Sequence, residues 1–292
     1  MPWRTFFQVD AFTTKAFEGN PAAVVGFDSD EFPEDNVLQA IAAENNLSET
    51  AFWRQREGEA GHFDLRWFTP TIEIDLCGHA TLACAHVVLH EVEGGKEGMN
   101  FHTKSGILPV QALDDGRLQM DFPVYFNASR PDLVQAVGAA LGELPQEVLW
   151  TEGNRDAIAI FPNALLVQNL SPDLSLLARL QSSALIATAP ASPHVSSSAK
   201  DSHDFVYRFF GPKIGIPEDP VTGSAQCSLA SMWAVKLGKD SLFSRQMSQR
   251  GGDLWARYLP PPPGGDGGVT GEARVLVSGR AISVIRGSLL VP

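Results

Sequence analysis

The stretch Leu65-Arg66-Trp67-Phe68-Thr69-Pro70 decides the fold, because it recurs in altered form as Tyr207-Arg208-Phe209-Phe210-Gly211-Pro212. The second copy follows the first after nearly half of the 292-residue chain. In the first copy Phe63, Leu65 and Trp67 alternate with Asp64 and Arg66, which predicts a strand that ends at Phe68-Thr69-Pro70. Repetition at this long spacing indicates that the chain is a duplication.

Other elements recur in the same order around these two stretches. Apolar periodicity predicts a helix over 34–45 in the first half and a counterpart over 172–180 in the second. Strands are predicted at 5–12, 22–27 and 50–55, and the last two of these have counterparts at 156–161 and 184–187. The sequence therefore predicts two similar α/β halves.

Each half also contains a run of small and apolar residues that begins with glycine, over 78–89 and again over 223–230. A helix that is apolar on every side is typical of one enclosed by a sheet. We place the boundary near residue 125, which gives an N-terminal half over 1–125 and a C-terminal half over 126–292. The last strand can cross back to the first domain.

Composition narrows the class of protein. Hydrophobic residues make up 44% of the chain and charged residues 19%, and no apolar run approaches the ~20 residues of a membrane span. The net charge is −12, from 22 basic and 34 acidic residues, and repels nucleic acid. Residues 1–4 lead directly into a strand without a signal-peptide pattern. These features predict a cytoplasmic protein with neither a membrane nor a nucleic-acid partner.

The three cysteines, Cys77, Cys84 and Cys227, are an odd number without Cys-x-x-Cys spacing. This argues against a disulfide framework and against a structural zinc site, so no metal is expected. Cys84 and Cys227 lie inside helical patterns and are predicted to be core residues. Cys77 is either a small buried residue or a reactive thiol beside a helix N-terminus, and the sequence leaves both open.

Both small-residue helices begin with glycine followed by a polar residue, Gly78-His79 and Gly223-Ser224. Helix N-termini carry unpaired N–H groups and a partial positive charge, which favour anions. Duplicated α/β proteins often place their site in the cleft between the halves. A small anionic substrate is therefore expected between the two helix starts. The alternative is that both glycines serve only close packing.

Glu49 lies between the predicted first helix, which Asn45-Asn46 should end, and the strand that follows. Such a connection lies on the rim of an α/β unit, where functional side chains are held rigidly yet stay accessible. The corresponding region of the second half, 182–184, contains no acid. Glu49 is thus a candidate base that only one half supplies. An ordinary solvated loop glutamate is the alternative.

Five motifs give the chain a specific resemblance over nearly its full length. They are Phe17-Glu18-Gly19-Asn20-Pro21-Ala22-Ala23-Val24, Asn46-Leu47-Ser48-Glu49-Thr50-Ala51-Phe52, Arg66-Trp67-Phe68-Thr69-Pro70, Cys77-Gly78-His79-Ala80-Thr81-Leu82-Ala83 and Glu218-Asp219-Pro220-Val221-Thr222-Gly223-Ser224-Ala225. The chain resembles the PhzF family of phenazine-biosynthesis isomerases, and most of all its eukaryotic phenazine-biosynthesis-like domain-containing branch. The resemblance implies the diaminopimelate-epimerase-like fold, with two pseudo-symmetric α/β (α+β) domains. In each domain a curled, mostly antiparallel sheet surrounds a central helix.

The resemblance also implies an activity and the residues that perform it. Family members move a proton between carbons of a cyclic dihydro-hydroxyanthranilate without a cofactor. Glu49 would be the general base and then the general acid, while His79 and Asp219 would position the substrate and its developing charge. The binding site would be lined by Ser48, Asn20, Gly78, Gly223 and Ser224.

Alternatives remain for these residues and for the function. Asp219 could instead cap a helix N-terminus, and His79 could be a core histidine. Related epimerases and racemases resemble the chain at Cys77 and use two thiols, but Asp219-Pro220-Val221 stands where the second thiol would be. A third hypothesis is a catalytically silent module that binds a protein partner. Because phenazine-making members carry alanine before Gly-His, Cys77 leaves the substrate open, and a homodimer is left open too.

Overall fold

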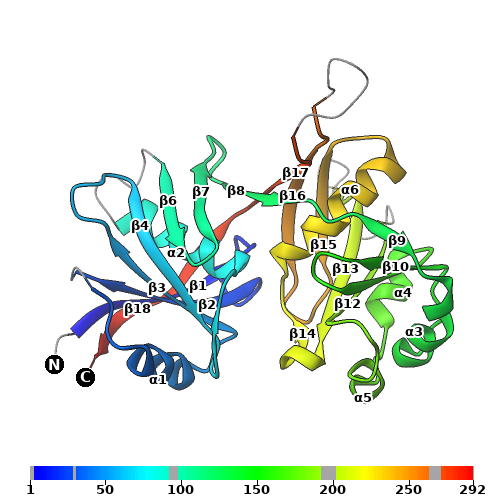
Figure 1. Cartoon of the computed structure of the whole chain (residues 1–292), viewed down its shortest axis with the longest axis horizontal. Coiled ribbons are helices and arrows are strands. Elements are labelled where there is room, and N and C mark those ends of the chain that lie inside the picture. Colours follow the sequence, from blue (N-terminus) through cyan, green and yellow to red (C-terminus); the bar gives the residue numbers. More distant parts are fainter. Residues whose placement is uncertain (1–2, 29–30, 92–97, 192–201, 263–270, 292) are drawn as a thin grey trace. The chain divides into compact units, whose positions relative to one another are not determined.

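A computed structural model describes residues 3–28, 31–91, 98–191, 202–262 and 271–291. The chain forms two compact units (Figure 1). Unit 1 comprises Met1–Asp121 and Ser278–Pro292, and unit 2 comprises Phe122–Val277. The chain thus crosses between units twice, where the sequence predicted a boundary near residue 125 and a return of the last strand.

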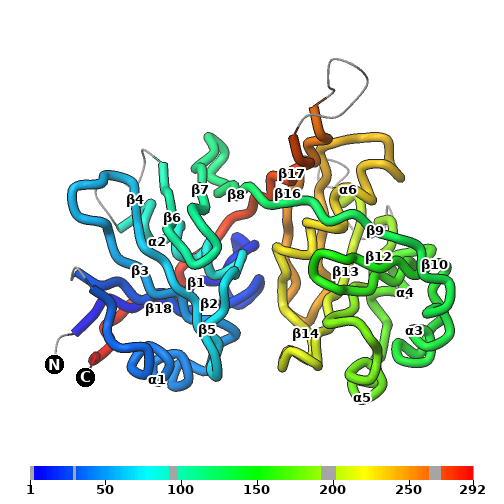
Figure 2. The backbone as a smooth tube through the Cα atoms, viewed as in Figure 1, coloured from blue at the N-terminus to red at the C-terminus, as the bar shows by residue number. Residues whose placement is uncertain are grey.

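Unit 1 is a sheet with helices on both of its faces. Its elements are β1 (Trp3–Ala11), β2 (Asn20–Phe27), α1 (Asp35–Asn45), β3 (Glu49–Gln55), β4 (His62–Phe68), β5 (Glu73–Ile74), α2 (Gly78–Glu91), β6 (Met99–Thr103), β7 (Gly106–Ala112), β8 (Leu118–Pro123) and β18 (Ala281–Leu290). The N-terminal and C-terminal strands β1 and β18 pair antiparallel (Figure 2). The C-terminal strand therefore completes the sheet that the N-terminus begins.

Unit 2 has a similar composition of elements. They are β9 (Asn127–Ser129), η2 (Pro131–Leu133), α3 (Val134–Leu141), β10 (Glu147–Thr151), β11 (Asp156–Ile160), α4 (Ala164–Asn169), α5 (Leu174–Leu177), β12 (Leu185–Pro190), β13 (Phe205–Gly211), η3 (Pro212–Ile214), β14 (Ile216–Asp219), η4 (Gly223–Ala225), α6 (Gln226–Leu237), β15 (Ser241–Gln246), β16 (Gly252–Leu259) and β17 (Arg274–Gly279). Its core is formed by side chains of α3, α4 and the strands around them.

Strand pairing confirms the predicted duplication. In unit 1, β2 and β3 are parallel, β3 and β4 antiparallel, and β4 and β6 parallel. In unit 2, β11 and β12 are parallel, β12 and β13 antiparallel, and β13 and β15 parallel. Both units therefore have the same succession of parallel, antiparallel and parallel pairings.

The repeated hexamer has the same structural role in both units. Arg66 of β4 donates from Nε and Nη2 to the two carboxylate oxygens of Glu73, both at 2.8 Å, and its guanidinium lies over the ring of Phe68. Arg208 of β13 does the same with Glu218, at 2.7 and 2.9 Å, and lies over the ring of Phe210. Bidentate pairs of this kind are strong and directional, which explains why arginine and aromatic residues recur together.

The two small-residue helices are central, as predicted. Every residue from Gly78 to Ala85 of α2 is buried, and α2 packs against β1, β2 and β3. In α6, residues from Gln226 to Ala234 are buried against β15 and β16. Neighbours surround both helices, so residues on all their faces are buried.

Two predictions on helices need correction. The predicted helix over 172–180 is limited to the single turn α5, which begins where the Asp173 carboxylate accepts the N–H groups of Ser175 and Leu176. The helix α4 was not predicted, because its six residues are too few to show a period and its start depends on one cap, the Asn163 side chain.

Candidate functional site

Glu49 is the first residue of β3, and local sequence places it there. The helix α1 ends at Asn46, which adopts a left-handed conformation with φ of 49° and donates its N–H to the Ala42 carbonyl. Asparagine tolerates this conformation better than most residues. The chain then reverses, and Glu49 enters the sheet opposite Ala22 of β2. The predicted rim glutamate is in fact buried, with 5% of its surface exposed.

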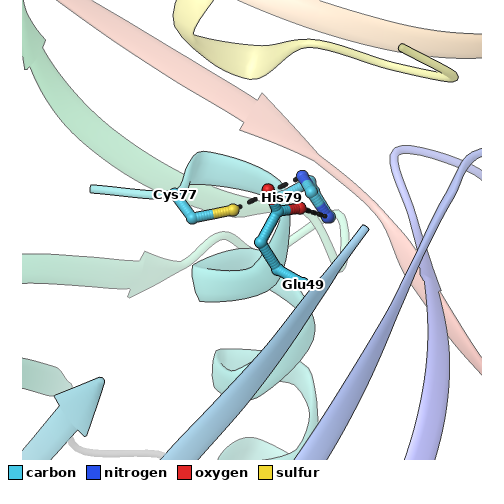
Figure 3. Close-up of side chains that lie close together, drawn as sticks. All are labelled: Glu49, Cys77 and His79. Carbon is cyan, nitrogen blue, oxygen red and sulfur yellow. Dashed lines mark hydrogen bonds and ion pairs between the residues drawn. The ribbon is translucent and has the colours of Figure 1, made fainter. Parts of the chain in front are cut away.

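Glu49 lies against His79, the second residue of α2 (Figure 3). The His79 Nε2 atom is 3.0 Å from the Glu49 carboxylate oxygen Oε2, and each side chain is 7% exposed. On the other side of the ring, Nδ1 is 3.5 Å from the Cys77 Sγ atom. Both ring nitrogens of His79 are therefore engaged, and its orientation is fixed.

The pKa values of this cluster are set by burial and by mutual charge. Burial acts to lower the pKa of His79, but Cys77 and Glu49 beside it raise that pKa well above its usual value. Burial raises the pKa of the Cys77 thiol, and the charge of Glu49 raises it further. Nε2 of His79 and Oε2 of Glu49 therefore form a buried ion pair, and burial favours the protonated form of the Cys77 thiol beside it.

The turn that carries Cys77 is fixed by α2 itself. The Cys77 carbonyl accepts the Thr81 hydroxyl at 2.6 Å and the Thr81 N–H at 3.1 Å. Gly78 is buried between Cys77 and His79 at the first position of the helix. This bonding holds the sulfur and the imidazole on the same side of the turn.

In unit 2, Asp219 is the last residue of β14 and is 7% exposed. Its carboxylate accepts the hydroxyl of Thr222. Thr222, and not Asp219, precedes the first helical turn η4, and no side chain caps that turn. The alternative that Asp219 is a helix cap is therefore wrong. Gly223 begins this 3-10 turn, which comes before α6 itself.

A buried glutamine holds the loop between Asp219 and Thr222. The Gln246 Oε1 atom accepts the Thr222 N–H at 2.7 Å, while Nε2 donates to the Asp219 carbonyl. The Tyr207 hydroxyl donates to the Thr222 carbonyl at 3.1 Å. Sequence reasoning missed both contacts. Gln246 is far from the loop in the chain and belongs to no motif, and the repeated hexamer that contains Tyr207 gives no sign of its bond to the loop.

The remaining predicted residues differ in exposure. Asn20 at the start of β2, Gly78 and Gly223 are buried, Ser48 is half-buried and Ser224 is exposed. In unit 1 the structure brings together Glu49 and His79 and adds Cys77, whose contact with His79 the sequence did not predict. Asp219, Gly223 and Ser224 lie on one loop and turn of unit 2.

Glu49, Cys77 and His79 also place potential metal ligands within 4.8 Å of one another. A thiolate, an imidazole and a carboxylate suit zinc. The sequence predicted no metal, and Glu49 and His79 also form the buried ion pair.

Comparisons with known proteins place the chain in a family. The family model described as phenazine biosynthesis-like protein matches residues 9–287. An uncharacterized isomerase of Pseudomonas aeruginosa is 42% identical over 97% of both chains. The mouse phenazine biosynthesis-like domain-containing protein 1 is 35% identical over 97% of this chain and 98% of its own. The crystal structure of a PhzF-family protein from Enterococcus faecalis superimposes with a TM-score of 0.85, at 36% identity, over 99% of this chain and 100% of that one.

The chain therefore belongs to the phenazine biosynthesis-like (PhzF) family, and the predicted family and fold are confirmed. The predicted enzyme class, an isomerase, agrees with the names of the curated relatives and is confirmed as well. The Pseudomonas aeruginosa relative, at 42% identity, is more similar to this chain than the mouse protein, at 35%. Among the described residues no helix is both long and apolar enough to cross a membrane.

Proposed function

We propose that this chain is a cofactor-independent isomerase in which Glu49 moves a proton between two atoms of a small, carboxylate-bearing metabolite. The observation that carries the proposal is the buried pair formed by Glu49 and His79, with Oε2 and Nε2 3.0 Å apart. A carboxylate withdrawn from water is a suitable general base for a carbon acid. The cyclic substrates of the family make a cyclic metabolite one candidate.

The reaction can be written as two proton transfers. The Glu49 carboxylate takes a proton from a substrate carbon, and the electron pair of the broken C–H bond moves into the adjacent unsaturated system. Glu49 is then neutral, so the charge of the protonated His79 beside it is free to stabilise the negative charge on the substrate. Finally Glu49 returns the proton to a different carbon and regains its ion pair.

His79 serves this cycle through its fixed position. Its Nδ1 faces the Cys77 sulfur at 3.5 Å and its Nε2 faces Glu49, so the ring cannot turn without losing both contacts. We propose that Ser48, Asn20 and Gly78 contact the substrate. The roles of Asp219, Gly223 and Ser224 in substrate binding stay predictions. The N-terminus of α2 is suited to the substrate carboxylate.

The test is hydrogen exchange in deuterated water. Purified protein is incubated with a metabolite extract, and mass spectrometry identifies components that gain a carbon-bound deuterium. We expect Glu49→Gln to reduce this exchange by about 10²–10⁴-fold while the protein stays folded. The control Glu57→Gln changes an exposed glutamate and should leave exchange unchanged.

Two outcomes would replace this proposal. Full exchange by Glu49→Gln, together with its loss in Cys77→Ser, would assign the chemistry to the thiol. The raised pKa of Cys77 and the absence of a second thiol at Asp219–Val221 speak against that mechanism. If no extract component exchanges and a stable protein complex survives both substitutions, the chain is a binding module.

A further inference from the structure

A second group of metal-binding side chains lies on the sheet of unit 1, away from the residues of the proposed reaction. Glu59 lies in the turn between β3 and β4, His62 begins β4, and His102 lies in β6. One ligand atom from each of these side chains lies within 4.8 Å of the other two. The proposed isomerase mechanism uses none of them.

The two imidazoles converge because their strands are neighbours. Strands β4 and β6 are parallel, with His62 opposite Asn100 and Asp64 opposite His102. The His62 Nδ1 atom is 2.8 Å from the His102 Nε2 atom, and the Glu59 Oε2 atom is 3.8 Å from His62 Nδ1. Two nitrogens and one oxygen from three segments of backbone therefore lie within 4.8 Å of one another.

The backbone that carries these ligands is well fixed. The turn is closed by hydrogen bonds from the His62 N–H to the Glu59 carbonyl, at 3.1 Å, and from the Asn100 N–H to the Gly61 carbonyl, at 2.8 Å. Gly61 has a φ of +73°, and a Cβ atom there would be 2.9 Å from the Gly98 carbonyl oxygen. Glycine is thus required for the turn to approach β6 this closely.

Arg56 orients the glutamate. Its Nε donates to Glu59 Oε1 at 3.2 Å, so Oε2 is the oxygen left facing His62. Partners that bind the second oxygen of a ligating carboxylate are common around metal sites, because they fix its direction. The guanidinium of Arg56 also repels a cation, which is partly offset because Arg56 is paired with Asp64 at 3.1 Å.

We propose that Glu59, His62 and His102 form a surface site for a divalent transition-metal ion, with Zn²⁺ as the probe. Two imidazole nitrogens and a carboxylate oxygen are ligands that zinc accepts, and water would complete a four-coordinate shell. With zinc–nitrogen bonds of about 2.0–2.1 Å, two tetrahedral nitrogens are about 3.3 Å apart. The two ring nitrogens therefore need to separate only slightly, and the ion takes the place of the proton that they now share.

Bound metal would join the β3–β4 turn to β6. His62 and His102 are half-buried and the Glu59 side chain is 45% exposed, so an ion can reach the ligands from solvent without unfolding. The ion would link strands β4 and β6 through side chains in addition to their backbone pairing. The site would thus act on the stability of unit 1 and not on the proton transfer.

The test is zinc titration of the untagged full chain by isothermal calorimetry, with anomalous diffraction from a zinc-soaked crystal to locate the ion. We expect one ion between the three side chains. His102→Ala should weaken binding at least about tenfold, which corresponds to about 1.4 kcal/mol. Glu59→Gln, a change on an exposed turn that leaves the strands intact, should weaken it in the same direction.

Two other groups of ligands serve as controls. The rings of His86 and His90 on α2 have centroids 4.6 Å apart, and Cys77 belongs to the buried group with Glu49 and His79. The variants His90→Ala and Cys77→Ser should keep the affinity of the unchanged protein. Unchanged zinc affinity in folded His102→Ala and Glu59→Gln would overturn the proposal, and so would loss of binding in either control.

Discussion

Units 1 and 2 share a succession of strand pairings, but the turns before their central helices differ. In unit 1 the turn before α2 places Cys77 and His79 in contact with Glu49. In unit 2 the turn before α6 binds its polar atoms to one another, through Asp219, Thr222 and Gln246. The same scaffold therefore holds an ion pair in one copy and a closed network of hydrogen bonds in the other.

Strand register identifies the position that corresponds to Glu49. In unit 1 Thr50 pairs with Phe68, and in unit 2 Leu185 pairs with Phe210, the matching residue of the repeated hexamer. Ala184 of unit 2 therefore occupies the place of Glu49, and this confirms that the second half has no acid there. The two copies therefore differ in this carboxylate while their strand pairing is the same.

A carboxyl group does occur beside this place in unit 2, on the neighbouring strand. By the same register Asp156 corresponds to Ala22, the residue opposite Glu49. Its Oδ1 accepts the Ala184 N–H at 3.1 Å. Glu49 is paired with a cation, whereas Asp156 binds backbone and the side chain of Asn154. Asp156 therefore stabilises the local fold of unit 2, whereas Glu49 is the candidate for chemistry.

The largest effect on stability should come from breaking the ion pair of unit 1. His79→Ala leaves the Glu49 carboxylate buried without its cation, which should cost about 3–5 kcal/mol of unfolding free energy. Chemical denaturation measures this cost. The matched change in unit 2, Ser224→Ala, alters an exposed side chain and should cost less than about 0.5 kcal/mol.

A double variant sharpens this test. Adding Glu49→Gln to His79→Ala removes the unpaired charge, so the double variant should be more stable than His79→Ala alone. If the effects of the two substitutions simply add, Glu49 and His79 are not an ion pair. Unit 1 would then not differ from unit 2 by a buried ion pair.

Asp156 should give unit 2 a pH dependence. Burial raises the pKa of Asp156 from 3.8 to about 7. Between pH 4 and pH 7 Asp156 is therefore protonated in the folded protein but ionised in the unfolded chain. The contribution is fully present below about pH 4 and is lost as the pH rises toward 7, by up to about 4 kcal/mol. Asp156→Asn should remove this dependence, and the variant should gain stability relative to the unchanged protein between pH 4 and pH 8.

Denaturation of both proteins at several pH values tests this sign. An equal pH dependence in the two proteins would show that Asp156 ionises alike in the folded and unfolded states. Asp132→Asn is the control, because Asp132 is an exposed aspartate whose pKa is lowered by its bond to Arg130. That variant should not flatten the profile.

Sequence predicted the duplication, the central helices and Glu49, because each leaves a local or repeated trace. Periodicity marks α1, a run of small and apolar residues marks α2, and the repeated hexamer contains the arginines of the two ion pairs. The burial of Glu49 and its contact with His79 could not be read from local pattern. They depend on how the start of β3 packs against the start of α2, which only the tertiary structure determines.

The hydrogen-bonded loop of unit 2 left no trace in the sequence for a similar reason. Gln246 belongs to β15, and only the parallel pairing of β13 with β15 brings it beside the loop. Nothing in an isolated glutamine distinguishes a fully buried one from an exposed one. The alternative that Asp219 caps a helix is wrong because Thr222, and not Asp219, occupies the position before η4.

Gln246→Ala should have an intermediate effect. The substitution removes the hydrogen bonds that Gln246 makes to the Thr222 N–H and to the Asp219 carbonyl, at a cost of about 1–3 kcal/mol. The Thr222 amide should also exchange hydrogen faster with solvent, which native-state exchange can measure. The control Gln168→Ala changes an exposed residue of α4. If both variants are equally stable, Gln246 does not hold the loop.

The smallest effect is expected at Cys77, where unit 1 has a thiol and unit 2 has Thr222. Because burial and the charge of Glu49 raise the pKa of the thiol, little thiolate exists at neutral pH, and alkylation should be slower than in the unfolded chain. Cys77→Ser keeps a small polar group beside His79 and should change proton exchange by less than about tenfold, since Glu49 and His79 perform the transfer. Peptide mass spectrometry separates Cys77 from Cys84 and Cys227, whose pKa values burial also raises. If Cys77 is labelled fast at neutral pH and the labelling stops hydrogen exchange of the substrate, the thiol is the reactive group. The functional difference between the two units would then lie in Cys77 and Thr222 instead of Glu49 and Ala184.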